Sequence, residues 1–186
     1  MTKIVGLSGA LRKSSTNRKL LREAVRIYGD VDFVEADLAL PLYDGDLEDA
    51  EGLPESVKTL VAEIASADAV LISTPEYNGG IPGVLKNALD WISRSDVKPW
   101  AGKPVAIMSA AAGRAGGARA LHNLRLAMAP FPARIVHGPE IMVAAAMDQF
   151  NGEGRIADNY EVLLKPLMEN LRDEVHRNAV AKATAA

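Results

Sequence analysis

Hydroxyl, amide and cationic side chains are concentrated between residues 8 and 17, directly after the first apolar run of the chain. The segment holds three adjacent hydroxyls, one amide and two cations: Ser14, Ser15, Thr16, Asn17, Arg12 and Lys13. A phosphate dianion needs such donors, and a helix beginning here would add oriented N–H groups and partial positive charge. The alternative is a solvated loop whose polar side chains only cap the helix.

Two later segments follow apolar runs in the same way. The segment 74–83 is rich in Pro and Gly, so Gly79 and Gly80 would let main-chain N–H groups approach a flat ring, against which Tyr77 can lie. The segment 109–117 has almost only small side chains, which leaves room for a bulky ligand beside the backbone. Each segment alone could be an ordinary turn, but three of them after successive strands indicate a binding site.

Familiar catalytic and phosphate motifs do not explain these segments. Gly-x-Gly-x-x-Gly does not follow the first strand, and the Gly-Lys-Ser/Thr of a Walker A loop is missing. The chain has no Cys, which excludes disulfides, Cys nucleophiles and dithiol redox chemistry, so any redox chemistry requires a bound cofactor. Three separated His and the absence of HExxH predict no metal site, and we assign no catalytic side chain.

Short apolar runs alternate with amphipathic stretches along the chain. The expected strands are 3–8, 31–36, 69–74, 104–110 and a fifth from 134–137, with 141–143 as a possible part of it. Helices are expected to start near residues 16, 54, 83 and 118, and after residue 157, the last being interrupted or kinked at Pro166. This order predicts a parallel sheet with helices on both faces, whose ligand binds beyond the carboxyl ends of the strands.

Bulk properties limit the function classes. With 186 residues, we predict one domain, 1–186, with a frayed tail at about 179–186. The net charge of −3 argues against nonspecific nucleic-acid binding. No apolar run reaches 18 residues and no secretory signal precedes the first strand, so we expect a cytoplasmic protein without a membrane span.

The segment from Pro75 to Trp91, PEYNGGIPGVLKNALDW, resembles the signature of the NADPH-dependent FMN reductase family, which includes quinone, chromate and azo-dye reductases. Ser8 to Asn17 is similar to the phosphate loop of that family, and Ser109 to Arg119 to its third loop. The resemblance runs from about residue 3 to residue 143. Ala10 and Gly80 depart from it, since Ser is frequent at both positions.

This resemblance implies a flavodoxin-like α/β/α sandwich with a five-stranded parallel sheet of order 2-1-3-4-5. It implies FMN as cofactor and NADPH or NADH as co-substrate. The expected cofactor-binding residues are Ser8, Arg12, Ser14, Ser15, Thr16, Asn17, Pro75, Glu76, Tyr77, Asn78, Gly79, Ser109 and Gly113. Among these, Arg12 and residues 15–17 would hold the phosphate, residues 75–78 would border the isoalloxazine ring largely through backbone groups, and Ser109 and Gly113 would lie near its polar edge or the cofactor entrance.

The implied reaction passes hydride from NAD(P)H through FMN to a small-molecule acceptor such as a quinone, a flavin, an azo compound or chromate. An electron-carrier flavodoxin is the main alternative, and a protein that keeps the fold without flavin is another. Arg114 and Arg119 are candidates for the phosphates of NAD(P)H, or are surface arginines or part of an interface pair. The family also implies a homodimer or homotetramer, with Trp91 and Trp100 either near a subunit contact or in the core.

Overall fold

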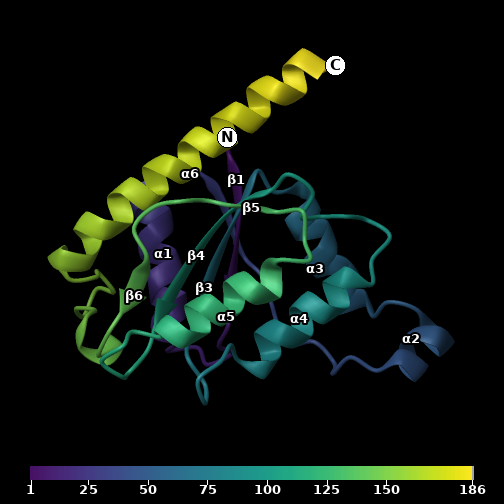
Figure 1. The fold of residues 1–186 in the computed structure, drawn as a ribbon, viewed down its shortest axis with the longest axis horizontal. Helices are drawn as coiled ribbons and strands as arrows, with labels where there is room; N and C mark the ends of the chain where they lie inside the picture. Colours follow the sequence, from purple (N-terminus) through teal and green to yellow (C-terminus); the bar gives the residue numbers. More distant parts are fainter. Residues whose placement is uncertain (186) are drawn as a thin grey trace.

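The computed structural model describes residues 1–185 and contains a sheet of six strands. Its strands are β1 (Lys3–Ser8), β2 (Asp32–Glu35), β3 (Ala69–Thr74), β4 (Pro104–Ala110), β5 (Arg134–Ile135) and β6 (Ile141–Val143). Its helices are α1 (Thr16–Tyr28), α2 (Gly45–Glu51), α3 (Glu55–Ser66), α4 (Gly83–Ser93), α5 (Ala118–Met128) and α6 (Asp158–Ala185), with a short 3₁₀ helix at Ala146–Asp148. All pairings between these strands are parallel, and the order β2-β1-β3-β4-β5 confirms the predicted topology (Figure 1).

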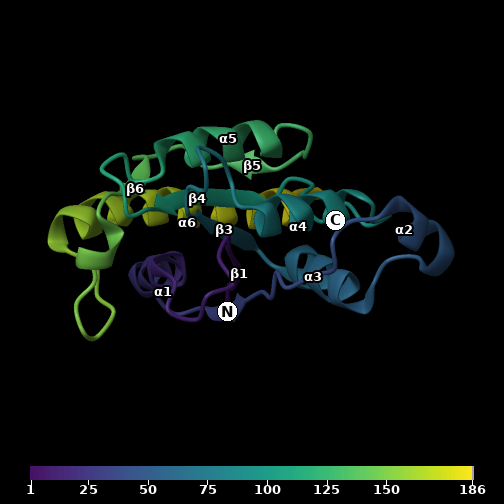
Figure 2. The same ribbon diagram turned by 90° about the horizontal axis from the view of Figure 1, so that it is seen from below.

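Helices cover both faces of this sheet. Alternate residues of each buried strand point to opposite sides, and both sets are apolar and must be covered. In β3, Val70 and Ile72 pack with α3, α4 and α5, whereas Ala69 and Leu71 pack with α1 and α6. Figure 2 shows α1 and α3 on opposite sides of the central strands. Trp91 and Trp100 are both buried in the core on the α3–α5 side, so core packing is the interpretation that this single chain supports.

The fifth strand position is shared by two short strands instead of one. β5 pairs with the start of β4 at Pro104 and Val105, and β6 pairs with its end from Met108 to Ala110. Between them lie Gly138 and Pro139, and proline has no N–H to donate to a ladder. A side chain at Gly138 would also approach Leu167 of α6 to about 3.1 Å. Pro139 therefore gives the break a local hydrogen-bonding cause, and close packing against α6 accounts for the glycine beside it.

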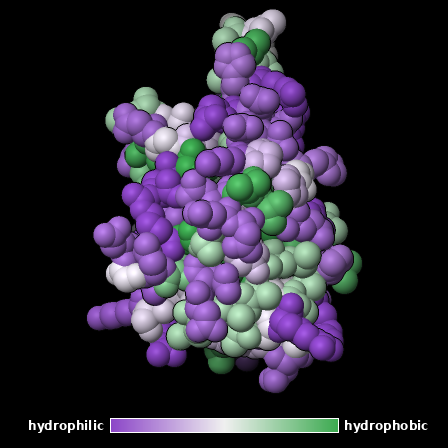
Figure 3. All heavy atoms as spheres, turned by 90° about the vertical axis from the view of Figure 1, so that its left-hand side faces the viewer, coloured by the Kyte–Doolittle hydropathy of each residue, from purple (hydrophilic) through white to green (hydrophobic). Residues whose placement is uncertain are grey.

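Two other expectations need correction. The loop 38–54, expected to be irregular, contains the short helix α2, which Asp44 caps by accepting the N–H of Asp46 at 2.9 Å. α6 is not interrupted at Pro166 but continues through it. Its last turns project beyond the rest of the molecule (Figures 1 and 3). The tail at about 179–186 is helical as far as Ala185, Ala186 lies outside the described residues, and fraying of this tail stays a prediction.

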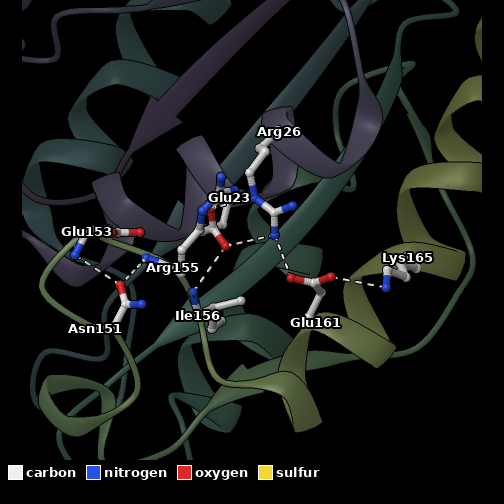
Figure 4. A network of polar contacts seen from close by, with 8 residues as sticks. All are labelled: Glu23, Arg26, Asn151, Glu153, Arg155, Ile156, Glu161 and Lys165. Atoms are coloured by element: carbon white, nitrogen blue, oxygen red, sulfur yellow. Dashed lines mark hydrogen bonds and ion pairs between the residues drawn. The ribbon is translucent and has the colours of Figure 1, made fainter.

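A buried carboxylate fastens the segment after β6 to α1. Glu23, whose side chain is 6% exposed, accepts hydrogen bonds from Arg26 at 2.8 Å and from the Ile156 N–H at 3.0 Å. Arg26 also pairs with Glu161 of α6 (Figure 4). The hydrogen bond to Glu23 is the largest cause that raises the pKa of Arg26. The hydrogen bonds from Lys165 and then from Arg26 lower the pKa of Glu161. This network joins α1, the hairpin 150–156 and α6.

Candidate functional site

Three loops meet at the carboxyl edge of the sheet. Strand pairing places Ser8 beside Ser73, and Thr74 beside Ser109, at the ends of β1, β3 and β4. The chain leaves β1 for β2 at the outside and then crosses to β3, so the strand order reverses between β1 and β3. A reversal of this kind opens a crevice at the carboxyl ends of the strands, where ligands bind in open α/β sheets. We call residues 8–17, 74–83 and 109–118 loops one, two and three.

Loop one presents hydrogen-bond donors at the positive end of α1. Ser15 is the N-cap of α1, and its hydroxyl oxygen accepts the Asn17 N–H at 3.1 Å, which leaves the hydroxyl proton for a ligand. The first turn of α1 carries no acidic residue, so no carboxylate neutralises the dipole there. Arg12 is exposed and its Nε donates to Ser14 Oγ at 2.8 Å. This donor set fits a phosphate dianion.

Two predicted ligands of loop one have hydrogen-bond partners within the protein. Asn17 is 1% exposed; its Nδ2 donates to Ala110 O at 2.9 Å, and its Oδ1 accepts from Ser73 Oγ at 2.8 Å and from the Ala110 N–H at 3.1 Å. Ser8 is buried, and its hydroxyl donates to Ala10 O at 3.2 Å. The Asn17 side chain therefore acts mainly by fixing the start of α1 against β3 and β4.

Loop two is a tight hairpin turn. Tyr77 and Gly80 exchange backbone hydrogen bonds of 3.0 and 3.1 Å, and φ is 51° at Asn78 and 80° at Gly79. Positive φ at both central residues defines a type I′ turn, for which Asn-Gly is the preferred sequence. Tyr77 is 56% exposed, which leaves its ring free to lie against a flat ligand. Pro75 is buried beside Gly9 of loop one, where a Cβ would lie 3.1 Å from its ring.

Loop three is held by its own backbone and by Ser109. Ser109 is fully buried and its hydroxyl donates to Gly116 O at 2.8 Å, so it shapes the loop from within. Gly116 has φ 60°, and a Cβ there would lie 2.4 Å from Met142 O, which no side chain tolerates. Gly113, in contrast, is exposed with no atom within 4 Å of a Cβ, so space for a ligand lies at this end of the loop.

Two arginines near the loops differ in their surroundings. Arg119, at the start of α5, pairs with Glu76 of loop two at 3.0 Å, whereas Arg114 is exposed on loop three. The larger described cavities lie elsewhere: one of about 640 Å³ between α4 and the end of α5, one of about 580 Å³ between Arg26 and the hairpin 150–156, and one of about 500 Å³ beside β5 and α6. Within residues 1–185, no group of three or more metal-ligating side chains occurs. Tyr77, Gly113 and Arg114 are exposed, so the loops present an open edge.

Sequence reasoning missed the residues that support the loops. Ser73 and Ala110 bind Asn17, and Asn123 of α5 accepts the Ile81 N–H of loop two at 3.4 Å. Ser73 directly precedes the loop at the end of a buried strand, and a polar residue at such a position is a usable signal because its hydroxyl needs a partner. Nothing comparable distinguishes Asn123 in the sequence.

Known proteins resemble this chain closely. Residues 2–148 match the family model described as NADPH-dependent FMN reductase. An NAD(P)H-dependent FMN reductase of Pseudomonas aeruginosa is 42% identical over 159 residues, which cover 84% of this chain and 85% of that protein. A quinone reductase of Escherichia coli is 42% identical over 142 residues, covering 75% of this chain and 76% of the relative.

A solved structure has the same architecture. FerB from Paracoccus denitrificans, described as a flavoenzyme NAD(P)H:(acceptor) oxidoreductase, superimposes with a TM-score of 0.84 at 30% sequence identity. The match covers 95% of this chain and 98% of FerB.

Proposed function

The chain belongs to the NADPH-dependent FMN reductase family, and from this premise we propose that loops one, two and three hold FMN at the carboxyl edge of the sheet. The protein is an FMN-dependent NAD(P)H oxidoreductase of the quinone reductase type, with a flavodoxin-like fold. One observation supports the proposed site most strongly: the first turn of α1 has no acidic residue to neutralise the positive end of the helix dipole. Ser15 caps this helix end, which lies next to the strand-order reversal.

The roles of the loops follow from their geometry. The hydroxyls of Ser15 and Thr16 and the guanidinium of Arg12 bind the phosphate, while Asn17 and Ser8 keep loop one in shape. The type I′ turn of loop two presents its backbone and Tyr77 to the ring. Loop three leaves room beside Gly113, and Ser109 acts by fixing the path of its backbone.

When bound, FMN supplies the hydride-transfer chemistry itself. The task of the protein is to orient the ring, to leave one face open to the nicotinamide and then to the acceptor, and to place backbone N–H groups where negative charge develops on reduction. The residue types fit this task, since loop three has mostly small side chains and Tyr77 is the only aromatic residue in the three loops. No side-chain acid or base is required.

The acceptor is a small molecule such as a quinone. Quinone reductases are among the relatives, and an open ring face admits planar acceptors of several kinds. We propose Arg114 as a contact for the phosphates of NAD(P)H, because it is exposed on loop three while Arg119 is engaged by Glu76. We also propose a cytoplasmic homodimer or homotetramer, to be checked by light scattering of the purified protein. Among residues 1–185, no helix is long and apolar enough to cross a membrane.

The test of the function is an anaerobic reduction. The protein is reconstituted with FMN and mixed with NADPH or NADH while the visible flavin absorbance is followed, and a quinone is then added. We expect rapid loss of absorbance and its recovery with the quinone. Bound flavin that stays oxidised with both nucleotides would identify an electron carrier instead, and failure to bind FMN would contradict both interpretations.

A further inference from the structure

The N-terminus of α5 has an unusual capping arrangement. The N-cap is Gly117, which has no side chain and adopts a left-handed φ of 87°. A Cβ at Gly117 would lie 3.0 Å from the Cβ of Ser109, so the usual Ser, Thr or Asp cap would be strained and crowded there. The first turn of α5 therefore needs a partner from elsewhere in the chain.

Glu76 of loop two is that partner. Its Oε2 accepts the backbone N–H of Arg119, the second residue of α5, at 3.1 Å, and its Oε1 accepts from Arg119 Nη1 at 3.0 Å. The Glu76 side chain is only 15% exposed, whereas that of Arg119 is 73% exposed. One carboxylate thus serves as a cap to the helix and as an ion-pair partner to a side chain on that same helix.

Loop two is held at its other end by the same face of α5. Asn123, one turn after Arg119, accepts the Ile81 N–H at 3.4 Å. Residues 119 and 123 therefore contact the chain just before and just after the type I′ turn. The aliphatic part of Arg119 also lies beside this turn, since a Cβ at Gly79 would be 3.8 Å from Arg119 Cδ.

From this arrangement we propose that Glu76 is a positioning residue, whose carboxylate locks loop two to the N-terminus of α5 and so sets the distance between loops two and three. The inference rests on the proposed function, in which both loops border the flavin ring. The arrangement also balances the negative charge of Glu76. The N-terminus of α5 and Arg119 neutralise this carboxylate, so no free negative charge faces the ring.

The closing experiment compares Glu76→Ala and Glu76→Gln with a matched control, Glu48→Ala. Glu48 is a good control because its side chain is 16% exposed and it pairs with Arg94, away from the three loops. Hydrogen exchange of the FMN-free protein is measured at the hydrogen-bonded amides of residues 77, 80, 81 and 119, and the Kd for FMN is measured by titration.

We expect Glu76→Ala to increase exchange at these amides by about tenfold, equivalent to about 1.4 kcal/mol, and to raise the Kd for FMN by a similar factor. Glu76→Gln keeps an acceptor for the Arg119 N–H and should recover most of both losses, while Glu48→Ala should leave exchange at these amides unchanged. Equal effects of Glu76→Ala and Glu48→Ala on exchange would overturn the proposal. Faster exchange with an unchanged Kd would confine Glu76 to helix capping and would overturn its link to the cofactor. If the wild type binds no FMN, the proposed function fails, while the exchange result still decides whether Glu76 locks the loop.

Discussion

Asn17, at the start of α1, is joined to Ala110, at the end of β4, by two hydrogen bonds between residues 93 positions apart in the chain. The Asn17 amide also accepts from Ser73 of β3. One buried side chain therefore fixes the helix start against the ends of two strands, at the place where the loops meet.

We predict that Asn17→Ala destabilises the protein by about 2–4 kcal/mol, because Ser73 and Ala110 would lose buried hydrogen-bond partners. Urea unfolding measures this change. The matched control is Asn170→Ala, since Asn170 donates one exposed hydrogen bond to His137 O and should cost less than about 1 kcal/mol. Similar losses for the two variants would show that Asn17 has no special role in the edge.

The glycines of loop three should separate folding from binding. Gly116→Ala forces a Cβ against Met142 O at a positive φ, so we expect a loss of about 3 kcal/mol or more, the result of strain and overpacking together. Gly113→Ala meets open space and should change the free energy of unfolding by less than about 0.5 kcal/mol. It should still weaken FMN binding, because the added methyl group occupies the proposed ligand space. Thermal unfolding and FMN titration of both variants provide the check, and a Gly113→Ala protein that binds FMN like the wild type would place the ring elsewhere.

Two glutamates should give opposite pH dependences. Burial raises the pKa of Glu63, so the carboxylate form destabilises the folded state, and stability is lost as pH rises through the folded-state pKa. Glu63→Gln should therefore be more stable than the wild type at neutral pH, with the difference vanishing in acid.

The carboxylate of Glu161 should have the opposite effect. Lys165 and Arg26 lower the pKa of Glu161, so its contribution to stability is present at neutral pH and is lost as pH falls through the folded-state pKa. Glu161→Gln should then be less stable at neutral pH only. Denaturant midpoints across the acid range test both signs, and parallel profiles for the two variants would refute the assignment.

The hairpin 150–156 should depend on Glu23. Glu23→Ala leaves the Ile156 N–H and Arg26 without their buried acceptor, and we expect a loss of about 2–3 kcal/mol. Limited proteolysis within the hairpin should also accelerate. Glu153→Ala is the control, because Glu153 lies in the same hairpin but is exposed. Equal cleavage rates in the two variants would show that Glu23 does not hold the hairpin.

The residues were sufficient to predict the parallel strands and the three loops, because buried parallel strands are short apolar runs and the loops after them differ sharply in composition. The strand order came from the family resemblance. The sequence was not sufficient to find the internal partners of Asn17 and Ser109, because Ala110 and Gly116 become their neighbours only through folding. The cofactor contacts expected for Asn17 and Ser109 stay predictions. The split between β5 and β6 was readable in principle, since Gly138 and Pro139 interrupt the run.

The proposed FMN site depends most directly on its phosphate end, where Arg12 and Ser15 lie at the start of α1. The decisive measurement compares the Kd for FMN with the Kd for riboflavin, which lacks the phosphate, in the wild type, Ser15→Ala, Arg12→Ala and the remote control Arg177→Ala. We predict that the wild type and Arg177→Ala prefer FMN by about tenfold or more, equivalent to about 1.4 kcal/mol, and that Ser15→Ala and Arg12→Ala reduce this preference without weakening riboflavin binding. Equal affinity of the wild type for both flavins, or equal loss of both in the loop-one variants, would contradict the proposed site.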